Sequence, residues 1–176
     1  DIRYSRRVFD EPGRYNTSLY LSPRFRPNDK LFFFLGFRKN DNYNEMGFVE
    51  NSNDSIFFGR RKVTEYESSI VGSYIFNNKM ALSLNLRHYW STAVYNRFNL
   101  VDNVNGELLE TDYAGFNDDG TTIHDRSFNA FNIDLGFRWR FAPGSDINLV
   151  WKNVILEDGD PLERSYFRDV EETIRA

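Results

Sequence analysis

The stretch Met80–Trp90 reads MALSLNLRHYW and carries the pattern that decides the fold. Apolar residues such as Leu82, Leu84 and Leu86 alternate along it with polar or small ones. Successive side chains of a β-strand point to opposite faces of a sheet, so this alternation gives one apolar and one polar face. Around an α-helix the same apolar residues would scatter instead of forming a stripe. The stretch therefore predicts a β-strand with two unlike faces.

The same alternation recurs along most of the chain, in six clear strands and a weaker one near the N-terminal end. A helix is expected only near the C-terminal end, where Asp160, Pro161 and Glu163 match the N-cap, N1 and N3 positions of a capping box. We therefore predict an all-β, antiparallel fold with strands near residues 2–9, 15–27, 31–39, 57–76, 79–99, 127–141 and 146–155, and a short helix near 161–174.

Short and long connections alternate between these strands. The short ones are residues 26–30, 77–79 and 142–145, and the long ones are residues 40–55 and 101–126. Within the last of these, Asn105-Gly106 predicts a type I′ turn and a hairpin over residues 99–113. Short turns at one end of a sheet and long loops at the other are typical of bacterial outer-membrane barrels.

The composition limits the classes of function. The chain has 176 residues, a net charge of −4, no Cys and two His, and 17 % of its residues are aromatic. The negative net charge disfavours general nucleic-acid binding, and the lack of Cys excludes disulfides and thiolate metal ligands. A mean hydropathy of −0.60 suggests a water-soluble protein, but transmembrane barrels also give low averages because apolar and polar residues alternate in them. We expect no cofactor and no metal ion.

The apolar faces allow two interpretations. They lie inside a soluble sandwich or barrel, or they face lipid on the outside of a transmembrane barrel. The apolar stripes span about 10 residues of strand, which is the length that a tilted strand needs to cross a bilayer. Aromatic residues gather near the stripe ends, as in the girdles of membrane barrels. We therefore predict part of an outer-membrane β-barrel of a Gram-negative bacterium, in contact with outer-membrane lipid, with further strands expected before Asp1 and after Ala176.

This interpretation assigns one set of side chains to lipid and the other to the lumen. The predicted lipid-facing residues are Leu82, Leu84, Leu86, Trp90, Phe131, Ile133, Leu135, Phe137, Trp139 and Trp151. The predicted lumen-lining residues are Arg24, Arg26, Arg38, Glu67, Arg87, Asp134, Arg138 and Arg140. Charges that leave water need partners, so a lattice of ion pairs is favoured for these residues over a path for a solute.

Five segments carry a family resemblance: 57–61 (FFGRR), 84–90 (LNLRHYW), 127–134 (SFNAFNID), 137–145 (FRWRFAPGS) and 149–153 (LVWKN). Together they resemble the C-terminal barrel region of a Bacteroidota outer-membrane family of unknown function. Members of that family carry a carbohydrate-binding-module-like domain ahead of the barrel, which these residues do not include. The resemblance implies a location and an architecture but no chemistry, because no catalytic motif is established for the family.

Few residues point to catalysis or to metal binding. His124 with Asp125 and Asp112 forms a candidate acid–base set, but no nucleophile motif accompanies it. The acidic loop around Gly120 offers oxygen ligands for calcium, although its spacing does not match an EF-hand loop. His88 lies on the apolar face two residues before Trp90 and is expected at the membrane interface.

We therefore expect a structural or transport role, or a subunit of a larger envelope assembly, with a polar lumen and acidic extracellular loops. Other envelope proteins are the expected partners, and nucleic acid is not. Two alternatives stay open at this point. One is a soluble carbohydrate-binding β-sandwich, and the other is a barrel enzyme with a loop-borne acid–base site. Enzymatic activity is the less favoured expectation.

Overall fold

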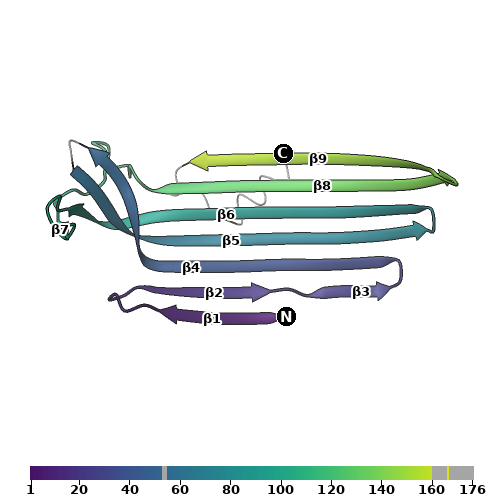
Figure 1. The fold of residues 1–176 in the computed structure, drawn as a ribbon, viewed down its shortest axis with the longest axis horizontal. Helices are drawn as coiled ribbons and strands as arrows, with labels where there is room; N and C mark the ends of the chain where they lie inside the picture. Colours follow the sequence, from purple (N-terminus) through teal and green to yellow (C-terminus); the bar gives the residue numbers. More distant parts are fainter. Residues whose placement is uncertain (53–54, 160–165, 167–176) are drawn as a thin grey trace.

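The computed structural model describes residues 1–52, 55–159 and 166, and its strands join in one antiparallel sheet (Figure 1). Its order is β1-β2-β4-β5-β6-β8-β9, with β3 paired to β4 and β7 paired to β6. The bounds are β1 (Ile2–Val8), β2 (Tyr15–Leu21), β3 (Arg24–Asn28), β4 (Leu31–Ser52), β5 (Ser55–Asn77), β6 (Met80–Val101), β7 (Leu108–Glu110), β8 (Arg126–Ala142) and β9 (Ser145–Gly159).

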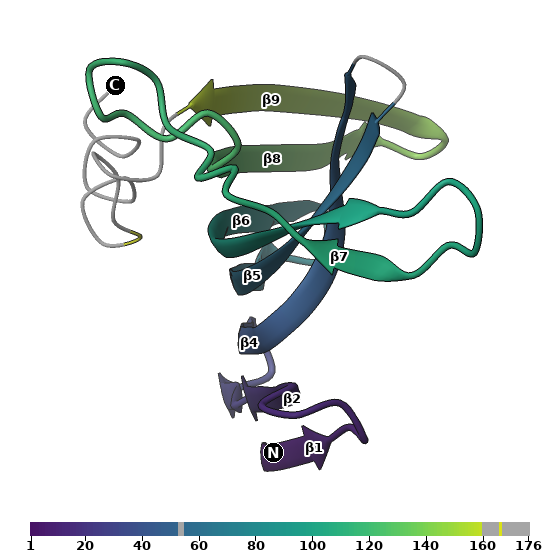
Figure 2. The same ribbon diagram turned by 90° about the vertical axis from the view of Figure 1, so that its left-hand side faces the viewer.

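The prediction of an all-β, antiparallel fold is confirmed. In the part of the chain that the structure describes, β1 and β9 lie at opposite edges of the sheet and do not pair with each other (Figure 2). Among residues 1–52 and 55–159 the structure defines no helix. The short helix predicted near 161–174 lies, apart from Tyr166, outside the described residues.

The longest departure from the sequence-based prediction lies in β4. Residues 40–55 were expected to form a polar connection, but β4 continues to Ser52 and β5 begins at Ser55. Asn40 pairs with Glu65, and the ladder then continues to the end of β4 and the start of β5, where Ser52 pairs with Ser55. This part of β4 has few apolar side chains, so its composition is typical of a loop although it forms a strand. A register shift follows Asn42, next to the positive φ of Asn44 (55°), where β4 bends (Figure 1).

Two smaller differences have clear causes. The predicted strand 15–27 is divided into β2 and β3, because Pro23 has no N–H to donate to the ladder. The hairpin around Asn105-Gly106 is confirmed by the pairing of Val101 with Leu108. Its turn is not of type I′, because Gly106 (φ 74°) has a positive φ and Asn105 does not. The Gly106 N–H donates to the Asp102 carbonyl at 2.8 Å, which closes a longer turn.

The register of the strands separates the apolar from the polar side chains. Leu84 lies opposite Gly72 on one side and Leu135 on the other, and Leu135 lies opposite Trp151. The next rung pairs Asn85 with Val71 and with Asp134, and its side chains point to the other face. The apolar stripes of the central strands therefore lie in phase and form one continuous face.

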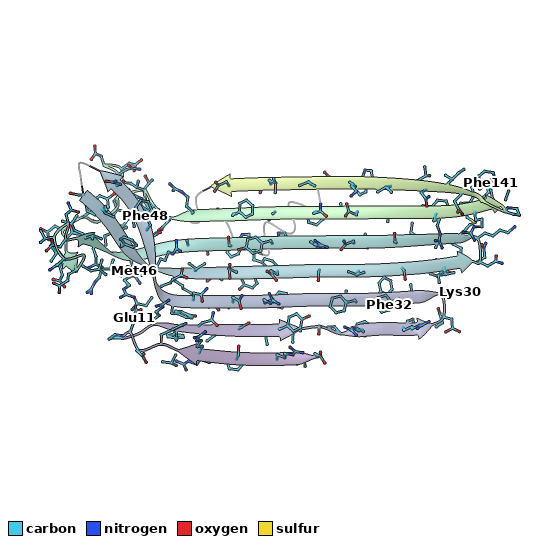
Figure 3. All side chains as sticks on the ribbon, viewed as in Figure 1. Glu11, Lys30, Phe32, Met46, Phe48 and Phe141 are labelled. Atoms are coloured by element: carbon cyan, nitrogen blue, oxygen red, sulfur yellow. The ribbon has the colours of Figure 1, made fainter. Side chains whose placement is uncertain are left out.

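The sheet is a single layer with almost no interior. Among the described residues, Trp90 (6 % exposed) and Phe98 (8 %) are the buried large apolar side chains. By contrast, Trp151 is 53 % and Leu149 is 61 % exposed. Figure 3 shows side chains projecting along the whole length of the layer, from the short-turn end, where Lys30 and Phe141 are labelled, to the opposite end. A sheet with one apolar face needs a second layer or another apolar medium against that face.

We expect the β8–β9 turn to depend on the left-handed conformation of Gly144 (φ 75°). A Cβ added there meets nothing within 4 Å, so Gly144→Ala should destabilise through backbone strain alone, by roughly 1–2 kcal/mol. Gly144→Asn should cost less, since Asn tolerates this conformation better than Ala. Denaturant unfolding of the two variants measures the difference, and equal midpoints would contradict this explanation.

Candidate functional site

The apolar face carries a belt that is eleven residues deep along β6, from Met80 to Trp90, or about 33 Å of strand. We call it the apolar belt. The register places on this one face all the residues predicted to face lipid: Leu82, Leu84, Leu86, Trp90, Phe131, Ile133, Leu135, Phe137, Trp139 and Trp151. Trp90 differs from the others because the rings of Tyr66 and Tyr166 pack edge-on against it, at 5.6 and 6.3 Å between centroids.

A buried polar pair lies at the Trp90 end of the apolar belt. His88 is 5 % and Asn129 is 1 % exposed, and the His88 Nε2 lies 2.7 Å from the Asn129 Oδ1. The Asn129 amide donates to Glu157 on β9 at 3.2 Å, and the Tyr166 ring stacks on the imidazole at 5.3 Å. His88 was predicted at an interface, and the structure places it at the end of the apolar belt as part of a hydrogen-bonded pair.

The opposite face, which we call the polar face, carries the residues predicted to line a lumen. The register places there Arg24, Arg38, Glu67, Arg87, Asp134, Arg138 and Arg140, and Arg26 follows at the irregularity after Phe25. Several are paired across strands: Arg38 with Glu67 at 3.2 Å, Lys152 with Asp134 at 3.6 Å, and Arg140 with Asp146 at 3.0 Å. These pairs are partly exposed, so each contributes little to stability.

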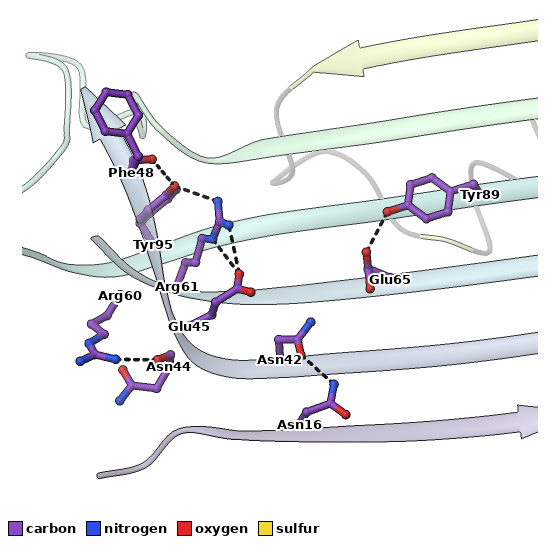
Figure 4. Close-up of polar contacts among 10 residues, drawn as sticks. All are labelled: Asn16, Asn42, Asn44, Glu45, Phe48, Arg60, Arg61, Glu65, Tyr89 and Tyr95. Carbon is purple, nitrogen blue, oxygen red and sulfur yellow. Dashed lines mark hydrogen bonds and ion pairs between the residues drawn. The ribbon is translucent and has the colours of Figure 1, made fainter. Parts of the chain in front are cut away.

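An open groove of about 400 Å³ crosses the polar face between β2 and β6. At Gly36, which lines the groove, an added Cβ would lie 2.4 Å from the Ser69 hydroxyl oxygen. Tyr89 at its edge donates to Glu65 at 2.9 Å (Figure 4). The groove therefore offers guanidinium, carboxylate, hydroxyl and aromatic groups together, which suits contact with a polar solute but defines no reaction. It is lined by Tyr20, Gly36, Phe37, Arg38, Glu67, Ser68, Ser69, Arg87, His88 and Tyr89.

Beyond the groove, β4, β5 and β6 continue as long strands, and polar contacts join them there (Figure 4). The Arg61 guanidinium binds the Glu45 carboxylate at 3.0 Å and donates to the Tyr95 hydroxyl at 3.1 Å. Tyr95 in turn donates to the Phe48 carbonyl at 3.2 Å. Sequence reasoning missed this network because residues 40–55 were not expected to be strand, so Glu45 had no predicted partner across the sheet.

The loop between β7 and β8 packs on the sheet through an aromatic cluster. The His124 and Phe98 rings lie 5.5 Å apart, and the His124 Nε2 lies 2.5 Å from the Tyr113 hydroxyl. The Asp125 carboxylate, 5 % exposed as a residue, accepts the Tyr95 backbone N–H at 2.8 Å. Burial lowers the pKa of His124 below its ordinary value of 6.5.

This cluster does not bring the candidate acid–base residues together. The polar atoms of His124 and Asp125 contact Tyr113 and the Tyr95 backbone, and no hydrogen bond in the described part of the chain joins Asp112 to either. The geometry is that of a docked loop. Gly115 (φ 69°) fits it closely, since an added Cβ would lie 2.5 Å from the Phe98 ring.

In the loop considered for calcium, the Asp119 carboxylate is bound within the loop itself. Asp119 accepts from the Thr121 N–H at 2.9 Å and from the Thr121 hydroxyl at 2.6 Å, and these bonds lower the pKa of Asp119. Within residues 1–52, 55–159 and 166, no group of three His, Cys, Asp or Glu side chains is placed to hold a metal ion. In the same part of the chain, no helix has the length and apolar character needed to cross a membrane.

The fold and its two faces define the class of the protein, an all-β protein built on a single antiparallel sheet with an apolar and a polar face. A family model described as "Domain of unknown function (DUF5916)" matches residues 1–176, so the chain belongs to this family. No curated protein and no solved structure matches the chain significantly.

The docking of the 111–125 loop should weaken in acid because of His124. Since the pKa of His124 is lowered when the loop is docked, the undocked state binds the proton more tightly, and docking loses stability as the pH falls through 6.5 toward the lowered pKa. Hydrogen exchange of the loop amides, corrected for intrinsic rates, should show lower protection below pH 6.5 than above it. His124→Gln should remove this dependence, and an unchanged pH profile in that variant would exclude the explanation.

Proposed function

We propose that this chain forms part of the wall of an outer-membrane β-barrel, with the apolar belt against lipid and the polar face toward a lumen. The observation that carries the proposal is the exposure of one continuous apolar face on a single-layer sheet. Trp151 and Leu149 on this face are more than half exposed, and no second layer covers them in the described part of the chain. Lipid supplies the apolar medium that such a face needs, and tilted strands of this depth fit a bilayer.

The arrangement of the connections supports the same proposal. Short turns join β3 to β4, β5 to β6 and β8 to β9 at one end of the sheet (Figure 1). The opposite end carries the extended halves of β4, β5 and β6 and the loop that follows β7. Outer-membrane barrels have short periplasmic turns and longer extracellular loops, so we assign the extended end to the cell surface. The resemblance to a Bacteroidota outer-membrane family agrees with this placement.

The polar face supports a structural or transport role within such a barrel. Cross-strand pairs such as Arg38 with Glu67 and Lys152 with Asp134 suit a lumen, where charges need partners. Strands beyond β1 and β9 would be needed to pair the open edges, because unpaired backbone groups cannot lie in hydrocarbon. Other parts of the same protein or another envelope protein would supply them. This membrane placement is favoured over a soluble carbohydrate-binding sandwich, because a sandwich needs a second sheet on the apolar face.

A charge in the middle of the apolar belt should prevent membrane insertion. Leu84→Arg, or Leu135→Arg beside it, should cost roughly 2–4 kcal/mol and reduce the fraction of full-length protein that inserts into vesicles and shows heat-modifiable migration on gels. Asn85→Arg is the matched control, because Asn85 is the next residue on the same strand and faces the other way. Equal loss in Leu84→Arg and Asn85→Arg, or a soluble folded Leu84→Arg protein, would contradict the lipid assignment.

A further inference from the structure

The face that carries the apolar belt changes its chemistry at the rung of Trp90. Lys39 on β4 lies in this rung, opposite Leu19 on β2 and Tyr66 on β5, and Tyr66 lies opposite Trp90. Two residues further along the strands on the same face, Asp41 lies opposite Thr17 and Thr64, and Thr17 lies opposite Arg6 on β1. Cationic and aromatic side chains thus replace the aliphatic ones directly beyond the belt.

These side chains form one connected group, which we call the cation–tyrosine band. It consists of Arg6, Tyr15, Lys39, Asp41, Tyr43, Lys62 and Tyr66. Each cation in it lies over a tyrosine ring: Arg6 over Tyr15 at 4.7 Å, Lys62 over Tyr43 at 4.9 Å and Lys39 over Tyr66 at 5.6 Å from the centroids. Tyr15 and Tyr43 stack on each other at 4.3 Å. The rings hold the charged groups in place without neutralising them.

The charge of the cation–tyrosine band is positive, although the chain as a whole has a net charge of −4. Its carboxylate, Asp41, is 6 % exposed and accepts the Thr64 hydroxyl at 2.8 Å. Lys39 reaches this carboxylate at 3.1 Å and Lys62 at 4.0 Å, and both lysine side chains stay more than a third exposed. Lys39 and Lys62 therefore share one buried carboxylate, and together with Arg6 they leave the band with a net positive charge.

We propose that the cation–tyrosine band binds the phosphate groups of lipid headgroups in the outer leaflet. The inference rests on the proposed function, because the band reaches headgroups only if the belt beside it lies in the bilayer. Lys and Arg side chains next to a membrane attract anionic headgroups, and tyrosine rings favour the same depth. The extended end of the sheet, on which the band lies, is the end that we assign to the cell surface.

The position of the band on the belt's face separates this site from the charges of the polar face. Arg38 is the chain neighbour of Lys39 but points to the other face, where Glu67 neutralises it at 3.2 Å. A headgroup in contact with the outer wall meets Lys39 and Lys62, whereas a solute in a lumen meets Arg38 and Arg87. Both faces of the sheet therefore carry cations, but only those of the cation–tyrosine band lie on the same face as the apolar belt, which we assign to lipid.

The experiment reconstitutes the full-length protein in vesicles of phosphatidylcholine, with and without phosphatidylglycerol. It measures the temperature at which the protein loses the faster gel migration of its folded form. We expect phosphatidylglycerol to raise this temperature in the wild type. Lys39→Gln/Lys62→Gln should lose most of the rise, and Arg6→Gln should lose part of it. Arg138→Gln/Lys152→Gln removes two cations from the polar face and should keep the full rise.

The outcomes distinguish the two proposals. Failure of the wild type to insert into phosphatidylcholine alone would overturn the proposed function and this inference with it. Insertion with no rise, or with an equal rise in all variants, would overturn the lipid-headgroup site alone. The same rise with inorganic phosphate would assign the site to free anions and not to lipid. Because Asp41 loses two partners in the double variant, Arg6→Gln, which leaves those contacts intact, decides the matter if the double variant does not fold.

Discussion

The hydrogen-bonded register of the central strands is the constraint on which the rest of this structure depends. In it, Leu84 lies between Gly72 and Leu135, and Arg38 lies opposite Glu67. A slip of one residue between any two strands would carry a whole stripe to the other face, and apolar and charged side chains would then alternate across the sheet. The apolar belt, the ion pairs of the polar face and the cation–tyrosine band all require the same alignment.

The sheet is stabilised differently along its length. Near the short turns, apolar side chains provide the contacts. Their burial stabilises the sheet fully only when another apolar phase covers the face. In the parts of β4, β5 and β6 far from the short turns, polar contacts such as the set of Arg61, Glu45 and Tyr95 lie beside aromatic contacts such as that of Phe48 with Phe58. Such contacts work in water, where surface ion pairs contribute little singly and gain by forming a network. The polar network lies beyond the rung of Trp90, on the side away from the short turns.

The alternation of residues was sufficient to predict the antiparallel sheet and the composition of its two faces. It failed where no face is buried, because the polar half of β4 then has the composition of a loop. The turn at Asn105-Gly106 was predicted by composition, but its backbone geometry depends on the hydrogen bond from Gly106 to Asp102, which the dipeptide does not specify. Strand phase can be read from a sequence, whereas turn type and strand length depend on contacts with the rest of the fold.

Candidate sites were harder to predict than strands for a related reason. His124 and Asp125 are adjacent in the sequence and were grouped as an acid–base set, yet their polar atoms bind different partners, Tyr113 and the Tyr95 backbone. The cation–tyrosine band could not be predicted from the sequence, because Arg6, Lys39 and Lys62 lie on three strands and are brought together only by the register.

The same reasoning supports the position of that band. A cation at the border of an apolar face is destabilising if hydrocarbon covers it, and it contributes little to stability if water does. It is favourable where hydrocarbon gives way to anionic headgroups. Lys39 and Lys62 lie at the border of the apolar belt, held by tyrosine rings and by one buried carboxylate. A soluble sandwich has no anionic interface at the end of its apolar face and so does not explain the position of these lysines, whereas a bilayer does.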